Sequence, residues 1–353
     1  MNLYLNDLKG KSIGIFANHT ALVGQTHLTD TLLALGIDVK SVFSPEHGFK
    51  GNQPDGELIT DQKAQRFELI SLYGKDKYPK DEDITDLDLL IIDIQDVGVR
   101  CYTYASSMTY LMEVCATNDV PVLILDRPNP NGSYVDGPVL DEDFKSFVGL
   151  HPIPLVHGLT LGELAQMING EGWLKDHLKC NLQVIPVQGW KHSNKYSLPV
   201  PPSPNLPNDQ AVALYPSLVL FEGTVVSVGR GTDYPFQVIG HPKYSLGSYT
   251  FTPSPNAASK YPPLEGEHCY GMNLSSVPVG DSLNLQYLIG FYMNLKDKIE
   301  GSFFKDYFTK LAGMDQLQQQ IEKGWSEKQI RESWREELDN YRVIREKYLL
   351  YED

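Results

Sequence analysis

The apolar run "LDLLIID" (87–93) decides the fold class of this 353-residue chain. A short run that is apolar at nearly every position is typical of a strand covered on both faces. Similar runs predict further strands at residues 12–18, 38–44, 120–126 and 180–187. Helical patterns lie between them at 26–36, at 105–119 and after Thr160, which forms a capping box with Glu163. Strands alternating with helices predict an α/β fold with a doubly wound parallel sheet.

The pattern changes after about residue 200. A proline-rich connector, "VPPSPNLPND" (200–209), is followed by short strand-like pieces at 224–229, 236–240 and 268–274. Helices are expected at 282–299 and 326–351, the last opened by a Ser326–Gln329 capping box. In that last helix, apolar residues repeat along one face, which is expected to pack against the rest of the protein. They are Ile330, Trp334, Leu338, Tyr341 and Ile344. We therefore expect two domains, an α/β domain at residues 1–230 and a smaller α+β domain at 231–353.

The composition argues against several classes of partner. The net charge is −15 and no basic run interrupts it, which argues against nucleic acid. No apolar stretch reaches the roughly 18 residues of a transmembrane helix. The four cysteines match no zinc spacing and are expected to be buried or idle thiols, with one disulfide left open: Cys101, Cys115, Cys180 and Cys269.

Polar side chains gather where the predicted strands end. In an open parallel sheet, ligands bind outside the carboxyl ends of the strands. These ends deliver, in chain order, Asn18, His19 and Thr20; Glu46 and His47; Asp93, Gln95, Asp96, Arg100, Tyr102 and Tyr104; Asp126, Arg127 and Asn129; and His157. This density predicts a site for a polar ligand.

The motifs that are missing narrow the chemistry of this site. The first strand-to-helix turn lacks G-x-G-x-x-G, and neither a P-loop nor G-x-S-x-G is present, so we expect no nucleotide cofactor and no serine hydrolase. His19, His47 and His157 with Asp93 are metal-ligand types, but no two come from one element, and we expect no metal. The chain has twenty tyrosines, and four aromatic residues lie in polar loops, namely Tyr102, Tyr104, Trp190 and Tyr234. Aromatic rings beside polar groups are suited to binding a sugar.

The stretch "FEGTVVSVGRGTDYPF" (221–236) adds two charged candidates from the second half. Glu222 follows an apolar segment, and Arg230 lies between two glycines. A guanidinium is suited to bidentate binding of a carboxylate. The alternative is a turn in which Arg230 forms a structural ion pair.

Taken together, these motifs resemble the exo-β-N-acetylmuramidase family, formerly a domain of unknown function. The resemblance spans residues 9–351 and is carried by "GIFANHTAL" (14–22), "SPEHGFKG" (44–51), "DIQDVGVRCYTY" (93–104), "DRPNPNG" (126–132), "VHGLTLGELA" (156–165), residues 221–236 and "REKYLLY" (345–351). It implies a Rossmann-like domain, a smaller C-terminal domain and an active cleft between them. The implied activity is hydrolytic removal of terminal N-acetylmuramic acid from the non-reducing end of peptidoglycan fragments, without a cofactor.

The resemblance makes Glu46 the leading catalytic candidate. Glycoside cleavage needs a carboxylic acid that protonates the leaving oxygen. Beside Phe43, Pro45 and Phe49, Glu46 is expected to keep its proton near neutral pH. His47 is expected to orient it or to bind substrate. The second catalytic group stays open among Asp93, Asp96, Asp126 and Glu222, or a tyrosine or histidine; Asp93 is our first choice.

Substrate-binding residues are expected around this pair. The lactyl carboxylate of N-acetylmuramic acid predicts an arginine anchor, either Arg100 or Arg230. The other expected contacts are Asn18, Asp96, Tyr102, Arg127, Asn129, His157 and Glu222.

The resemblance also implies a location and leaves two rival functions. Family members are usually exported and normally begin upstream of the segment "LYLNDLKGK" (3–11), so we expect an extracytoplasmic protein (periplasm or cell surface) whose export signal is missing from this sequence. The rivals are a non-catalytic protein that binds cell-wall sugars and a metal-dependent hydrolase such as a deacetylase.

Overall fold

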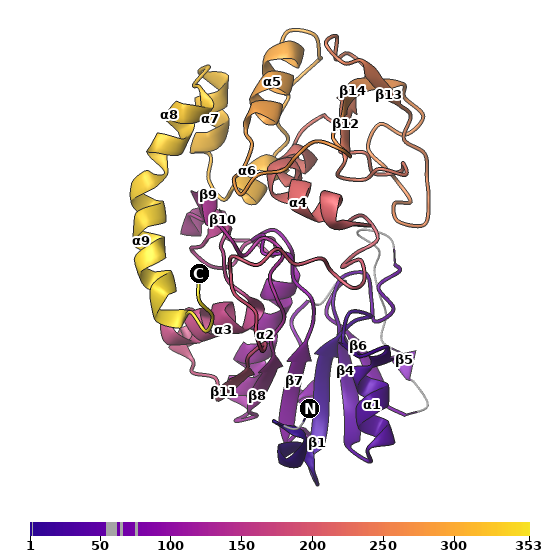
Figure 1. Cartoon of the computed structure of the whole chain (residues 1–353), viewed down its shortest axis with the longest axis vertical. Coiled ribbons are helices and arrows are strands. Elements are labelled where there is room, and N and C mark those ends of the chain that lie inside the picture. The colour runs from indigo at the N-terminus through magenta and orange to yellow at the C-terminus, as the bar shows by residue number, and fades with distance from the viewer. Residues whose placement is uncertain (2, 54–61, 64–65, 75–76) are drawn as a thin grey trace.

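The computed structural model describes residues 1, 3–53, 62–63, 66–74 and 77–353. A large sheet occupies one end of the molecule, a smaller sheet with helices occupies the other, and the last helices run along one side (Figure 1). None of the described helices has the length and apolar character that a membrane span requires.

The large sheet is built from six parallel strands and one antiparallel edge strand, in the order β11-β8-β7-β1-β4-β6-β5. The six parallel strands are β1 (Ser12–Ala17), β4 (Asp38–Ser44), β6 (Glu68–Ser71), β7 (Leu89–Asp93), β8 (Val122–Leu125) and β11 (Leu182–Ile185); the edge strand is β5 (Gln62–Lys63). The chain first extends the sheet from β1 toward β6 and then returns to the other side of β1, which is the Rossmann strand order. The predicted fold class is therefore confirmed. Strand β6 was not predicted, because it is only four residues long and contains two apolar residues.

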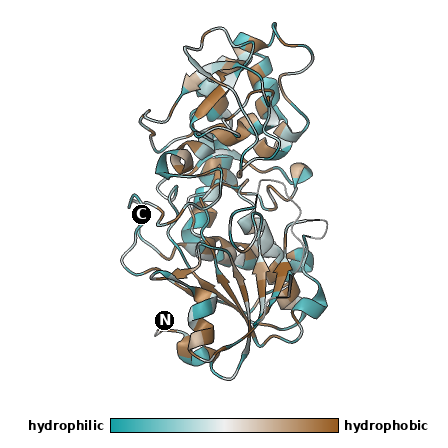
Figure 2. Ribbon diagram, turned by 90° about the vertical axis from the view of Figure 1, so that its right-hand side faces the viewer, coloured by the Kyte–Doolittle hydropathy of each residue, from teal (hydrophilic) through white to brown (hydrophobic). Residues whose placement is uncertain are grey.

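Side-chain alternation along the strands places helices on both faces of the sheet. Ile13 and Ile15 of β1 pack with Leu28 and Leu32 of α1 (Leu28–Ala34). Phe16 of the same strand belongs to the larger cluster on the opposite face, which includes apolar residues of α2 (Tyr104–Thr117) and α3 (Leu161–Gly170). The brown, hydrophobic strands in Figure 2 lie between these helices. Burial on both faces explains why the central strands are apolar at nearly every position.

The C-terminal part combines helices with a small antiparallel sheet, as the smaller α+β domain predicts. The sheet has the order β12-β14-β13, with β12 (Val238–His241), β13 (Tyr249–Phe251) and β14 (Cys269–Asn273). The helices are α4 (Asp209–Leu218), α5 (Gln286–Leu295), α6 (Tyr307–Ala312), α7 (Gln316–Glu322), α8 (Glu327–Ser333) and α9 (Arg335–Arg345). Two short antiparallel pairs complete the fold: β2 (Leu22–Val23) with β3 (Thr26–His27), and β9 (Asp136–Val139) with β10 (Pro154–Val156).

Three local predictions need correction. Helix α4 begins directly after the proline-rich connector, because the Asn208 side chain accepts a hydrogen bond from the backbone of Ala211. The segment 224–229 forms isolated bridges to Phe304 and Gly240 and no strand. The predicted final helix is divided into α8 and α9 at Trp334, although its capping box and the burial of its apolar stripe are confirmed. The domain boundary at residue 230 stays a prediction.

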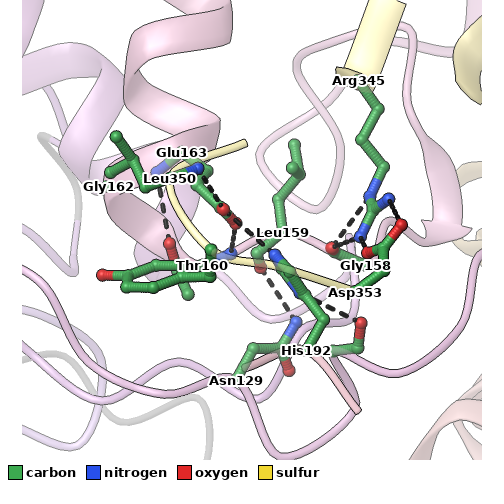
Figure 3. A network of polar contacts seen from close by, with 12 residues as sticks. Asn129, Gly158, Leu159, Thr160, Gly162, Glu163, His192, Arg345, Leu350 and Asp353 are labelled. Carbon is green, nitrogen blue, oxygen red and sulfur yellow. Dashed lines mark hydrogen bonds and ion pairs between the residues drawn. The ribbon is translucent and has the colours of Figure 1, made fainter. Parts of the chain in front are cut away.

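The C-terminal tail folds back onto the sheet domain through a buried polar network (Figure 3). The backbone N–H of Leu350 donates to Glu163 Oε1 at 2.8 Å, and His192 Nε2 lies 3.0 Å from the same oxygen. Arg345 at the end of α9 donates to the carbonyl of Gly158 and pairs with Asp353 at 3.0 Å. These contacts hold the C-terminal tail against the sheet domain beside α3.

Candidate active site

A cavity of about 520 Å³ lies where the ends of the parallel strands meet the C-terminal part. This volume falls within the range of about 300–1,000 Å³ that is usual for small-molecule sites. The loop after β4 contributes Glu46 and His47, and the loop after β7 contributes Cys101, Tyr102 and Thr103. The C-terminal part contributes polar side chains from three places, namely Glu222, Arg230 and Lys310. The cavity is therefore built from both halves of the chain.

Glu46 is half-buried at the wall of this cavity, and its carboxylate is held by one hydroxyl. Thr103 Oγ1, immediately before α2, donates to Glu46 Oε2 at 2.9 Å. His47 follows in the left-handed region at φ +68°, which is uncommon for a residue with a side chain. Its Nδ1 lies 2.9 Å from the carbonyl of Gln53 and so carries the proton of that hydrogen bond. The turn thus fixes the imidazole beside the cavity and orients the strand end that presents Glu46.

The apolar surroundings expected for Glu46 are different in the structure. Phe43 is buried in the core of the sheet domain, and Phe49 packs edge-on against His27 and Phe67. Neither of them, nor Pro45, lines the cavity. The apolar lining comes from residues that sequence reasoning did not select, among them Phe147, Val148, Leu206 and Phe236.

Glu222 and Arg230 form an ion pair at the cavity wall. Arg230 Nε lies 2.7 Å from Glu222 Oε1, and the guanidinium carbon lies 5.1 Å from the ring centroid of Phe236. Arg230 therefore lines the cavity and forms the ion pair that the alternative interpretation predicted, and its binding of a substrate carboxylate stays a prediction.

Arg100 lies in the interior, and its placement argues against a role as a substrate anchor. Its guanidinium donates to four backbone carbonyls at 2.7–3.0 Å, those of Pro138, Ile153, Leu311 and Ala312. Burial lowers the pKa of Arg100 to about 10. This side chain joins the β9–β10 region to the end of α6 and does not line the cavity.

Asp93 and Arg127 pair with each other away from the cavity. Arg127 Nε lies 2.5 Å from Asp93 Oδ1, and Asp93 is 3% exposed. Burial raises the pKa of the Asp93 carboxyl, and the Arg127 charge opposes this shift. The choice of Asp93 as a catalytic group, and of Arg127 as a substrate contact, is not supported by this geometry.

Four other expected contacts are buried within the loops of the rim. Asn18 donates to the Tyr104 hydroxyl, and Asn129 donates to the carbonyl of Leu159. His157 Nδ1 accepts from the Leu159 backbone, and burial lowers the pKa of His157 to about 3. Asp96 accepts from the backbone N–H of Gly98, and burial raises the pKa of Asp96 to about 7. These side chains form hydrogen bonds within the protein and do not line the cavity, so this geometry does not support the prediction that they contact substrate.

The Asp126 carboxylate also forms its hydrogen bonds away from the cavity. Its Oδ2 accepts hydrogen bonds from the hydroxyls of Thr160 and Tyr351, both at 2.6 Å. Burial raises the pKa of Asp126 to about 6. Of the four acids left open for the second catalytic role, Glu222 is the one that lines the cavity.

The aromatic residues of the cavity are mostly ones that the sequence did not single out. Tyr102 lines the cavity, but Tyr104 is buried against the connector, Trp190 packs on Tyr351, and Tyr234 lies outside the cavity. The lining rings that were missed are Tyr73, Phe147, Tyr215, Phe236 and Tyr307. Tyr73, Phe147, Tyr215 and Tyr307 lie outside the quoted motifs, whereas Phe236 ends the motif 221–236 and Thr103 lies beside Tyr102 in the motif 93–104.

The cysteine thiols give no sign of nucleophilic or metal chemistry. All four cysteines are free and buried. Cys101 lines the cavity, but burial raises its pKa to about 12, so the thiolate form is scarce at neutral pH. Within the described part of the chain, no group of three or more His, Cys, Asp or Glu side chains is placed to hold a metal ion.

Comparison with known proteins assigns the family. Residues 13–210 match the N-terminal model, and residues 213–351 the C-terminal model, of "Exo-beta-N-acetylmuramidase NamZ". The chain is 35% identical to the peptidoglycan beta-N-acetylmuramidase NamZ of Bacillus subtilis (strain 168), over 99% of this chain and 89% of that protein.

Two crystal structures of DUF1343 family proteins from Bacteroides fragilis NCTC 9343 share this architecture. One has a TM-score of 0.91 and 47% identity, with 100% of this chain and 97% of that chain covered. The other has a TM-score of 0.83 and 26% identity, with 99% and 97% covered. With both family models matched in order along nearly the whole chain, this protein belongs to the exo-β-N-acetylmuramidase NamZ family.

Proposed function

We propose that this protein is an exo-acting glycoside hydrolase that releases terminal β-N-acetylmuramic acid from the non-reducing end of peptidoglycan fragments. The observation that carries the proposal is a cavity that holds Glu46 and a second carboxylate, Glu222, in a chain of the exo-β-N-acetylmuramidase family. Two carboxyl groups at one site are the usual requirement for glycoside hydrolysis.

Each carboxyl group has a neighbour that suits it to a different role. Thr103 donates to Glu46 Oε2, which leaves Oε1 as the oxygen from which Glu46 delivers a proton to the leaving group. Glu222 is paired with Arg230, and a guanidinium neighbour favours the ionised carboxylate. Glu46 is thus assigned as the general acid and Glu222 as the charged partner.

Substitution of the two acids tests these roles. With a muramyl-terminated disaccharide as substrate and chromatography of the released sugar, Glu46→Gln is expected to lower turnover at least about a hundredfold, the scale of general acid catalysis. Glu222→Gln is expected to lower turnover on a similar scale, because the charged partner is lost. Circular dichroism of both variants checks that they fold. Near-normal turnover by Glu46→Gln rejects the assignment of the acid.

The same assay separates the rival functions. A non-catalytic binder binds the disaccharide without releasing sugar, which calorimetry beside chromatography reveals. A metal-dependent hydrolase loses activity in EDTA, whereas the two-carboxylate reaction is expected to continue.

We also propose that the protein acts outside the cytoplasm, in the periplasm or at the cell surface. The support is the proposed substrate class, since peptidoglycan lies outside the cytoplasmic membrane. Fractionation of cells that carry the full-length gene, followed by immunodetection, tests this location.

A further inference from the structure

The described lining of the candidate active site carries a net positive charge within an acidic protein. Among the described residues that line the cavity, three are cationic, namely Lys77, Arg230 and Lys310, and two are carboxylates, Glu46 and Glu222. Over these residues, three positive charges less two negative charges give a formal +1, whereas the whole chain carries −15. A cavity with this balance attracts an anionic ligand more strongly than the surrounding surface does.

The net positive charge comes from the lysines. Arg230 and Glu222 neutralise each other through their 2.7 Å contact. Lys310 lies on α6 with an exposed side chain, and no ion pair or hydrogen bond of its ammonium group occurs among the residues that the structure describes. Its charge is therefore available to a ligand in the cavity.

Lys77 supplies a second ammonium group from the sheet domain. Its Nζ lies 4.2 Å from the ring centroid of Phe147 and 5.3 Å from that of Tyr73, and both rings line the same cavity. A cation–π contact holds an ammonium group in place without neutralising its charge. The two amines thus approach the cavity from opposite halves of the chain.

We propose that Lys310, assisted by Lys77, binds the lactyl carboxylate of the terminal sugar and so determines the preference for an acidic hexosamine. This assignment rests on the proposed function and replaces Arg100 and Arg230 as the anchor. A neutral hexosamine lacks the carboxylate and gains nothing from the two ammonium groups. Because Lys310 is solvent-exposed, its contribution is that of an exposed ion pair, a modest one.

The test compares two substrates with the same leaving group, 4-methylumbelliferyl β-N-acetylmuramide and its lactyl methyl ester. For Lys310→Gln, KM for the acid is expected to rise about fivefold, the upper scale of an exposed ion pair, with kcat nearly unchanged. KM for the ester is expected to change less than about twofold, since the ester carries no charge. Lys77→Gln is expected to act in the same direction and to add to the loss in the double variant.

Matched variants distinguish the effect of a positive charge at Lys310 from the effect of a positive charge elsewhere on the protein. Lys310→Arg keeps the positive charge and is expected to keep the preference for the acid. Lys323→Gln removes an exposed lysine after α7, away from the cavity, and is expected to match the wild type. Raising the ionic strength is expected to reduce the preference of the wild type toward that of Lys310→Gln.

The outcomes distinguish this proposal from the function on which it rests. An unchanged ratio of kcat/KM for acid over ester in Lys310→Gln overturns the anchor while the muramidase activity stands. Equal losses on both substrates also overturn it, because they indicate a structural effect. If the wild type cleaves neither substrate and leaves a muramyl disaccharide intact, the proposed function itself fails.

Discussion

At the scale of single residues, one hydrogen bond positions Glu46, the leading catalytic candidate. Thr103 Oγ1 lies 2.9 Å from Glu46 Oε2, and no other hydrogen bond of this carboxylate occurs among the described residues. Thr103 is 9% exposed, so water competes little for its hydroxyl. A donor on one carboxyl oxygen leaves the other to carry the transferable proton, which makes Thr103 a positioning residue for Glu46.

Removal of this hydroxyl is expected to act on turnover more than on binding. Thr103→Val keeps the shape of the side chain and is expected to lower kcat about tenfold, the scale of one hydrogen bond, with KM within about twofold. Thr103→Ser restores the hydroxyl and is expected to restore most of kcat. Steady-state kinetics across pH provides the measurement, and a shifted basic limb is expected in Thr103→Val, because a general acid is active in its protonated form. A Thr103→Val enzyme with wild-type kcat and pH profile contradicts the positioning role.

At the scale of elements, helix α3 shows how a local signal in sequence acquires a tertiary role. The Thr160–Glu163 capping box forms as predicted, with the Glu163 carboxylate accepting from the backbone of Thr160 at 2.9 Å. The Thr160 hydroxyl also donates to Asp126 Oδ2 at 2.6 Å, at the end of the neighbouring strand β8. The same side chain therefore begins the helix and joins it to the sheet.

Because the Thr160 hydroxyl has both roles, its removal is expected to destabilise the protein more than the removal of an ordinary N-cap. Thr160→Ala is expected to lower the free energy of unfolding by about 2 kcal/mol, about 1 for the cap and about 1 for the bond to Asp126. Ser326→Ala at the solvent-exposed capping box of α8 is the matched control, with an expected loss of about 1 kcal/mol. Urea titration of the three proteins measures the difference. Equal losses in the two variants would show that the bond to Asp126 adds nothing.

At the scale of the whole molecule, the backbone of the buried residue His157 joins the last helix to the sheet domain. The Tyr341 hydroxyl of α9 donates to the carbonyl of His157 at 2.7 Å, and the His157 side chain is 1% exposed. Burial, together with the charges of Arg345 and Arg100, lowers the pKa of His157 to about 3. The folded protein therefore keeps this imidazole neutral at pH values where an unfolded chain protonates it.

The sign of the resulting pH dependence follows from the lowered pKa. Below the unfolded value of about 6.5 the unfolded state binds the proton, so the stability contribution of neutral His157 is complete above pH 6.5 and is lost as the pH falls toward 3. Between pH 7 and pH 4 this residue is expected to reduce the free energy of unfolding by about 3 kcal/mol. In His157→Asn the decrease over this interval is expected to be smaller by that amount, as measured by urea titration at each pH. The exposed His268→Asn is the control, and identical slopes in all three proteins would refute the assignment.

The sequence by itself determined the sheet and the position of Glu46. Apolar runs separated by amphipathic helices specify parallel strands covered on both faces, because each strand must bury both rows of side chains. The capping boxes at Thr160 and Ser326 could also be predicted from the sequence, since a capping box depends on residues three positions apart. The Glu46–His47 pair at the end of β4 followed from the same logic, because ligands bind where parallel strands end.

Only the tertiary structure decided which polar side chains face the cavity. Several strand ends carry such residues, and most of these residues bond to neighbouring segments of the protein, as Arg100 does with carbonyls more than 200 positions away at Leu311 and Ala312. Lys310 lies in no motif and enters the site because α6 packs beside the strand ends. The physical reason is that buried polar groups must find partners wherever the fold supplies them. Which hydrogen-bond partners are within reach depends on contacts between distant segments, and local sequence patterns do not encode these contacts.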